Sequence, residues 1–446
     1  DPWLPSDPLE CGDCMSNVLF LPGIMGSRLF DGETKRWEAS SESDVAALYL
    51  DAEGKSINPN ISATEIVDEF DFFGIPDPNI YKSFLADLEA ASSTGKIARY
   101  NAYAYDWRLS IPDILSDGEL EQTLRDLAAS SKTGKVAVIA HSNGGLLAKA
   151  LINQLGLDAQ NLIDQVVLVG VPQIGTPQAI GALLHGADSG IATQYSAERA
   201  RDFAHNAPFA HQLLPQSDYY DNAGASIATP LISFETGTKT QQFISTYGTS
   251  IIDMSDVRHF ILGEDGRPTP AYENLEVPGK GNSTLYTNAE AYLSDIGASW
   301  QPPAGITVHQ IAGIGELTMS GITYKTLREC TRRIFWHCDA YEDKLSYVPE
   351  RVVDGDNTVV VPSALAMNVD PEQTKRWWVN LDDYNFPLLP QVLRTNHKDL
   401  LEISELRTFI FDYLLNSTTS ASLPRYLAAS APVLDDAHRL SAVLLS

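Results

Sequence analysis

The chain has 446 residues, of which 44% are hydrophobic and 20% charged, so it is long enough to bury a large core and is not intrinsically disordered over most of its length. Its formal charge of −27 argues against a nucleic-acid partner, whose phosphates would repel it, and disfavours anionic membrane surfaces at long range. No apolar stretch approaches the roughly 18 residues that a membrane-spanning helix needs, so no transmembrane segment is expected.

The first predicted element is a strand. Val18 to Leu21 is a continuous apolar run that Pro-Gly ends, which is typical of a fully buried strand. Asp31-Gly32 predicts a hairpin turn, and residues 38–79 are polar and irregular. This stretch carries an aromatic cluster, which we expect to be an ordinary core cluster rather than an acyl-binding or interfacial surface: Phe70, Phe72 and Phe73.

Apolar spacing then alternates between the helical and the extended pattern. Runs rich in Val, Ile and Leu between helices predict an α/β fold with a mostly parallel sheet that helices cover on both faces. Helical spacing covers residues 80–91, 120–129 and 144–155, and strand-like runs cover 97–104, 135–140 and 165–171.

Two excursions interrupt this alternation. It breaks from 176 to about 304, a strand-like run resumes at 306–312, and 314–352 is a second excursion. A last strand is expected at 377–381 and an amphipathic helix at 400–415. The predicted organisation is a core over 1–180 and 305–415, a cap or lid insertion over 181–304, and a loosely attached C-terminal tail over 416–446.

The four cysteines form two local pairs, Cys11/Cys14 and Cys330/Cys338. Two short-loop disulfides are the preferred interpretation, because an even number of cysteines suits an exported protein. Free thiols or a zinc site stay open as alternatives. We therefore expect a secreted, periplasmic or cell-surface location.

The segment Ala140-His-Ser-Asn-Gly-Gly145 lies between a predicted strand and a predicted helix. This pattern is typical of a nucleophile elbow, in which Ser142 takes a strained backbone conformation with its hydroxyl above the sheet. The residues two before and two after the serine must be small, and Ala140 and Gly144 meet this requirement. The alternative is a serine that only caps a helix.

A serine nucleophile needs a base and a group that orients the base. In folds with this elbow, the acid and then the histidine follow the serine along the chain. Asp354 and Asp356 lie in a downstream loop, and His397 comes just before the last predicted helix, where the base should lie. A surface-loop histidine is the alternative for His397, whereas His309, inside a predicted strand, is interpreted as structural.

Acyl transfer also needs donors for the oxyanion of the tetrahedral intermediate, usually two backbone N–H groups. One should come from Asn143, the residue after the nucleophile. The other should come from the loop after the first strand, where glycines let N–H groups turn inward, and Ile24 is the expected donor. A plain tight turn is the alternative.

Five motifs follow one another along the chain: Leu21-Pro-Gly-Ile-Met-Gly26, Tyr105-Asp-Trp-Arg108, Ala140-His-Ser-Asn-Gly144, Gly170-Val-Pro and Gly355-Asp-Asn-Thr-Val359. Together they resemble the lecithin:cholesterol acyltransferase-like family of α/β-hydrolases, over residues of about 18–180 and 305–415. The resemblance implies an α/β-hydrolase fold with Ser142 as nucleophile, His397 as base, an oxyanion N–H at Ile24, and Asp356 rather than Asp354 as the orienting acid. Residues 181–304 match no cap of known specificity.

Two further groups of residues are candidates for substrate contact. Tyr105-Asp-Trp-Arg108 is interpreted as structural, because Asp106 and Arg108 are spaced to organise a strand end. The insertion should roof the site, since ligands bind beyond the carboxyl ends of the strands. Its apolar residues are predicted to contribute acyl-binding surface, with the core of the cap itself as the alternative: Phe203, Phe209, Leu213 and Leu214.

The sequence therefore predicts a serine carboxylic ester hydrolase of the lipase, phospholipase or esterase type, possibly with acyltransferase activity, that works through an acyl-enzyme. Its expected partner is an ester or lipid substrate, and no cofactor or metal is implied. An amidase or peptidase with the same triad and an inactive binding scaffold are the alternatives, and the oligomeric state stays open.

Overall fold

A computed structural model describes most of the chain. The N-terminal cysteine pair, Phe72 and Phe73 lie outside the described residues. The described residues are 15–70, 79–187, 196–223, 230–368, 370, 372–386, 393–416 and 422–434.

A seven-stranded sheet in the order β14-β13-β10-β7-β6-β1-β5 forms the centre of the fold. All its strand pairs are parallel except β13 with β14. The six strands predicted in this sheet are confirmed, but the prediction that 377–381 is the last strand is wrong, because β14 is too short to leave a periodic signal. The strands are β1 (Asn17–Leu21), β5 (Tyr100–Ala102), β6 (Val136–His141), β7 (Ile163–Val169), β10 (Thr307–Ile314), β13 (Thr374–Asn380) and β14 (Leu427–Ala428).

Helices cover both faces of this sheet, as predicted. Successive strand residues point to opposite faces, so Leu19 and Val138 pack in the cluster that contains α4 and α5, whereas Phe20 and Ile139 pack in the cluster that contains α2 and the C-terminal helices. The helices beside the sheet are α2 (Lys82–Ser93), α3 (Ile111–Leu115), α4 (Glu119–Ser130), α5 (Asn143–Leu155), α6 (Ala159–Leu162), α14 (Val361–Ala364) and α15 (Leu381–Tyr384), with the 3₁₀ turn η1 (Gly156–Asp158).

The single helix expected at 400–415 is instead three helical segments. These are the 3₁₀ helix η4 (His397–Glu402), α16 (Ser404–Thr408) and the π-helix η5 (Phe409–Leu415). Ile403 between the first two is extended, with ψ 114°. Apolar residues such as Leu406 and Phe409 still face the core, so the helical spacing persists across a break that it does not reveal.

A small antiparallel sheet follows β1. Its strands are β2 (Ser27–Asp31), β3 (Thr34–Trp37) and β4 (Ile61–Ile66), with α1 (Glu42–Ala47) between the last two. The predicted turn at Asp31-Gly32 is confirmed, and Gly32 has φ 61°. The expectation that 38–79 is wholly irregular is wrong, because β4 pairs with β2 through a short run of mixed polar and apolar residues.

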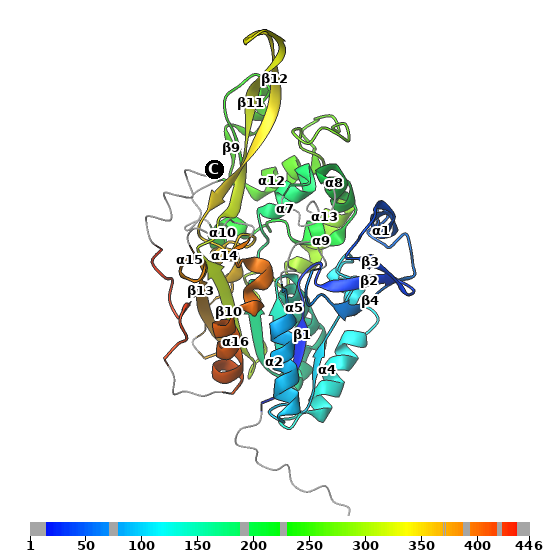
Figure 1. Ribbon diagram of the computed structural model, residues 1–446, viewed down its shortest axis with the longest axis vertical. Coiled ribbons are helices and arrows are strands. Elements are labelled where there is room, and N and C mark those ends of the chain that lie inside the picture. Colours follow the sequence, from blue (N-terminus) through cyan, green and yellow to red (C-terminus); the bar gives the residue numbers. More distant parts are fainter. Residues whose placement is uncertain are drawn as a thin grey trace, which may run out of the picture.

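The insertion and the second excursion share one four-stranded sheet, ordered β12-β11-β8-β9. The sequence predicted 181–304 and 314–352 as two separate segments and did not predict that their strands pair in one sheet. Figure 1 shows the cap helices gathered at one end of the central sheet, with a long hairpin of β11 and β12 that projects beyond them. The elements are α7 (Gln178–His185), α8 (Ala197–His205), α9 (Pro208–Gln212), α10 (Tyr219–Ala223), β8 (Ile232–Phe234), α11 (Gln241–Tyr247), β9 (Ser250–Ile251), α12 (Met254–Leu262), α13 (Ser283–Leu293), β11 (Thr318–Ile334) and β12 (His337–Val352).

The carboxyl edge of the central sheet faces the cap sheet. β10 ends at Ile314 and leads within a few residues into β11, which pairs with β8. β6 and β7 are parallel to β10 and end at the same edge. Among the described residues, no helix combines the length and the apolar character needed to cross a bilayer.

Candidate active site

Ser142 is the single residue between β6 and α5. Its backbone has φ 53° and ψ −130°, a conformation that is costly for a residue other than glycine and is typical of a nucleophile elbow. The glycines after it allow a close approach of strand and helix. A Cβ on Gly144 would lie 2.4 Å from the carbonyl oxygen of Leu21, and one on Gly145 would lie 2.2 Å from a methyl carbon of Val171.

The structure brings the three predicted catalytic side chains into one hydrogen-bonded series. The Nδ1 atom of His397 lies 2.8 Å from Oδ2 of Asp356, and Nε2 lies 2.8 Å from Oγ of Ser142. A proton on Nδ1 faces the carboxylate, so Nε2 is the acceptor for the serine hydroxyl. Asp356 is fully buried, and Ser142 and His397 are each 7% exposed.

The backbone around Asp356 fixes this series. Its Oδ1 atom accepts the N–H groups of Thr358 (3.1 Å) and Val359 (2.8 Å), and its carbonyl accepts the N–H of His397 (2.8 Å). Gly170 has φ 59°, and a Cβ there would lie 3.1 Å from the His397 ring. Asp356, and not Asp354, is therefore the carboxylate that the fold delivers to the histidine.

The loop after β1 packs directly on the nucleophile. A Cβ on Gly23 would lie 2.9 Å from the Cβ of Ser142. Met25 has φ 61°, and the N–H of Gly26 donates to the carbonyl of Gly23 (3.1 Å), so the loop is a tight turn. Within the described parts of the chain, the N–H groups of Ile24 and Asn143 have no hydrogen-bond partner.

A buried network that the sequence did not predict connects this loop with the histidine. The carbonyl of His397 can only accept, so Nε2 of His141 donates to it (2.8 Å), and Nδ1 of the neutral ring is then an acceptor. The hydroxyl of Tyr81 therefore donates to Nδ1 of His141 (2.8 Å) and accepts the N–H of Gly23 (3.0 Å). Burial lowers the pKa of His141 to about 3, with the charge of His397 as a second cause. A neutral His141 is what this chain of donors requires.

The contacts of the segment from Tyr105 to Arg108 agree with its interpretation as structural. Arg108 is fully buried and pairs with Asp106 through Nε–Oδ1 (2.9 Å) and Nη2–Oδ2 (2.6 Å). Its Nη1 donates to the carbonyl of Leu48 (2.7 Å). The Tyr105 hydroxyl donates to the carbonyl of Pro22 (2.7 Å), and this bond fixes the start of the loop after β1.

The four apolar residues predicted for acyl binding lie in the hydrophobic core where the cap meets the sheet domain. Phe203 and Phe209 have ring centroids 6.5 and 5.5 Å from that of Trp107. Leu213 and Leu214 are 8% and 2% exposed. This placement agrees with the alternative that they form the core of the cap, and their contact with an acyl chain stays a prediction.

Residues that could hold a metal do not gather in the described part of the chain, where no group of three or more His, Cys, Asp or Glu side chains has a suitable arrangement. A disulfide joins Cys330 to Cys338, as the cysteine spacing predicted. His309 is buried in β10 and accepts from the Trp377 indole (3.2 Å), which agrees with its interpretation as structural.

A mostly parallel sheet with helices on both faces, and a serine on the sharp turn between a strand and a helix, define an α/β-hydrolase. The chain belongs to the lecithin:cholesterol acyltransferase family, whose family model matches residues 64–385. The match includes Ser142 and Asp356 and ends before His397. Membership places the protein among lipid-ester hydrolases and acyltransferases.

The solved structures that match this chain include the following two. One, from the crystal structure of the Tle4–Tli4 complex, is 14% identical with a TM-score of 0.50, and the alignment covers 91% of this chain and 99% of that one. At this identity, the likeness shows the fold alone. Phospholipase PlaB from Legionella pneumophila is also 14% identical, but its TM-score is 0.25 and the coverage is 49% of this chain and 36% of that one. No curated protein matches the chain.

Proposed function

We propose that the protein is a serine carboxylic ester hydrolase that cleaves a lipid or another bulky ester through an acyl-enzyme. The observation that carries the proposal is the position of His397, 2.8 Å from both Ser142 and Asp356. In such an arrangement the histidine can take the serine proton while the carboxylate stabilises the imidazolium that forms.

In the first half-reaction, Oγ of Ser142 attacks the ester carbonyl and His397 accepts its proton. The N–H groups of Ile24 and Asn143 donate to the oxyanion, a role supported by their lack of other partners in the described residues. The intermediate collapses when His397 returns the proton to the leaving alcohol. Ser142 is then esterified with the acyl group.

In the second half-reaction, His397 takes a proton from water, whose oxygen attacks the acyl carbon. His397 then returns this proton to Oγ of Ser142 as the acyl-enzyme ester bond breaks, which releases the carboxylic acid and restores the serine. An acceptor alcohol in place of water would give acyl transfer by the same steps. We further propose that the protein works outside the reducing cytosol, which the Cys330–Cys338 disulfide supports.

A substrate panel tests the reaction class. Matched p-nitrophenyl esters and anilides, together with triacylglycerol and phospholipid, should give turnover of esters and little turnover of anilides. Ser142→Ala should abolish it, whereas Ser93→Ala, on the exposed face of α2, should not. Anilide turnover equal to that of the ester would assign an amidase, and no turnover of any ester by the parent would favour a binding scaffold.

Asp356→Asn and Asp354→Asn form a matched pair for the orienting acid. Asp356→Asn should lower kcat by about 10³-fold or more, because the histidine loses the group that fixes its tautomer. Asp354→Asn should leave most of the activity. The reverse result would overturn the assignment of the acid.

A further inference from the structure

The tip of the β11–β12 hairpin exposes two large aromatic side chains at the far end of the molecule. Ile334 pairs with His337, so Phe335 and Trp336 form a two-residue turn. They are 91% and 96% exposed. Figure 1 shows this tip beyond every other element drawn as a ribbon. We propose that the tip, defined as Cys330 to Cys338, docks on the surface of an anionic lipid bilayer and inserts Phe335 and Trp336 at its interface.

Turn geometry does not explain these two residues. Two-residue hairpin turns favour Asn-Gly or similar pairs, because the backbone needs positive φ there. Phe335 has φ 53°, which is unfavourable for a bulky side chain. Side-chain packing does not explain them either, since both are almost fully exposed. Trp and Phe are the residues that membrane-surface proteins place at the boundary between headgroups and acyl chains.

The charge of the tip complements anionic headgroups. The segment from Cys330 to Cys338 contains Arg332 and Arg333 and no Asp or Glu. Arg332 also contacts Asp339, whereas Arg333 has no ion-pair partner in the described residues. The disulfide between Cys330 and Cys338 closes the segment and holds the arginines and the aromatic turn together.

The hairpin is long enough to separate this charge from the acidic body of the protein. The cap reaches β11 as far as Arg328, whose strand partner Asp343 bonds to Thr238, and the four residues from there to Arg332 span about 13 Å at about 3.3 Å per residue. Charges in physiological salt are screened over about 8 Å. Within that distance lie Glu329 and Asp339, which pair with Lys344 and Arg332, so Arg333 leaves a net positive charge at the tip. The formal charge of −27 on the whole chain acts only at long range.

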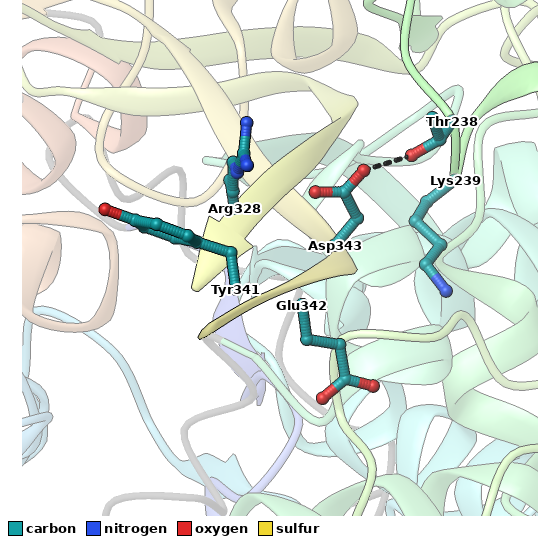
Figure 2. A pocket seen from close by; sticks show the side chains of 6 residues that line it. All are labelled: Thr238, Lys239, Arg328, Tyr341, Glu342 and Asp343. Atoms are coloured by element: carbon teal, nitrogen blue, oxygen red, sulfur yellow. Dashed lines mark hydrogen bonds between the residues drawn. The ribbon is translucent and has the colours of Figure 1, made fainter. Parts of the chain in front are cut away.

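The lower part of the hairpin is fixed to the cap, and the upper part stands free of it. Thr238 donates to Asp343 (2.7 Å), and the N–H of Lys239 donates to Thr326 (3.0 Å). Figure 2 shows the first of these bonds. The side chains drawn there line a hollow of about 630 Å³. Above it, the described pairs, such as Arg328 on the Tyr341 ring, stay within the hairpin.

The base of the hairpin lies at the candidate active site. β11 begins at Thr318, whose Oγ1 accepts the N–H of Asn357 (2.7 Å), next to Asp356. The hairpin would thus connect a membrane-bound tip directly to the loop that carries Asp356. A second copy of the chain is a poorer occupant, because two aromatic side chains bury about 150–250 Å² each, far below the roughly 1,200 Å² of a stable interface.

Vesicle flotation tests the proposal without any need for turnover. The parent and Ser142→Ala should both float with vesicles of equal parts phosphatidylcholine and phosphatidylserine, and more weakly with phosphatidylcholine alone. Phe335→Ala/Trp336→Ala should lower the partition coefficient on both kinds of vesicle by about tenfold or more. Arg332→Gln/Arg333→Gln should lower it by about tenfold on the anionic vesicles only.

Matched controls separate the tip from general surface hydrophobicity. Leu157→Ser/Ile252→Ser removes two other exposed apolar side chains, 82% and 74% exposed, and should not change flotation. Trp336→Phe should retain most of the binding. Hydrolysis of a dissolved short ester should be equal in the parent and all tip variants, so a failure of docking is distinguishable from a failure of the proposed reaction.

Three results would overturn the proposal. The first is a parent that does not float with either vesicle, and the second is a double aromatic variant of Phe335 and Trp336 that floats as well as the parent. The third is a parent that dimerises in solution and becomes monomeric in the double aromatic variant, since that would assign the tip to a second copy of the chain.

Discussion

Tyr81→Phe tests whether the buried network holds the loop after β1. The change removes only a hydroxyl, which accepts the N–H of Gly23 (3.0 Å) and donates to His141 (2.8 Å). Both partners are left unsatisfied in a buried site. Each such group costs about 1–3 kcal/mol, so the free energy of unfolding should fall by about 2–6 kcal/mol.

The same change should affect turnover more than substrate affinity. Loss of a whole oxyanion donor costs about 10²–10³ in kcat. Tyr81→Phe only loosens the loop that carries the Ile24 donor, so kcat should fall by about tenfold, with little change in KM. Urea unfolding and hydrolysis of a dissolved p-nitrophenyl ester measure the two effects.

Tyr100→Phe is the control for this variant. Its hydroxyl donates to Glu89 (3.1 Å) at the protein surface, where water can replace the bond. Its stability should change by about 0.5 kcal/mol or less. The reasoning is refuted if Tyr81→Phe unfolds at the same urea concentration as the parent and keeps its kcat.

Three further predictions follow from the contacts around the site. Gly170→Ala should reduce kcat by about tenfold or more, because the new Cβ would lie 3.1 Å from the ring of His397. Gly156→Ala is the control: its φ is similar, but its new Cβ would have no atom within 4 Å, so only the stability should fall. Equal kcat values of the two variants would contradict this. Arg108→Ala should lower the unfolding free energy by about 3–5 kcal/mol, because Asp106 loses a buried partner; full stability with lost activity would instead indicate a substrate clamp. Burial lowers the pKa of His309 to about 3. As the pH drops, this histidine is therefore protonated in the unfolded chain before it is protonated in the folded one, and stability falls between about pH 6.5 and pH 3. His309→Asn should reduce the loss of stability between pH 7 and pH 5 by about 2 kcal/mol, and an unchanged pH dependence of urea unfolding would contradict this.

Local patterns were sufficient to predict the elbow and six of the seven strands of the central sheet, all except β14. The strands around β6 are buried on both faces, so their sequences are almost purely apolar. The elbow requires small residues within a few positions of Ser142, and those lie together in the chain. Chain order then selected His397, and the family resemblance selected Asp356 over Asp354.

Contacts between distant segments were not accessible in this way. Tyr81 reaches His141 across 60 residues, and neither residue signals the other in the sequence. β14 has two residues, and β4 pairs through a short mixed run, so neither leaves a periodic pattern. β11 has 17 residues, which is longer than an ordinary strand, and it carries many charges. Its sequence therefore lacks the apolar pattern of a strand, and residues 314–352 were interpreted as irregular.

The central claim is that Ser142 is the nucleophile of a histidine-assisted reaction. A fluorophosphonate that forms a covalent adduct with activated serines, followed by intact mass and peptide mapping, tests it most directly. The account predicts one adduct per chain, on Ser142, with labelling at least about 10³-fold slower in His397→Ala. An adduct on another residue, or labelling of Ser142 that is equally fast without His397, would contradict it.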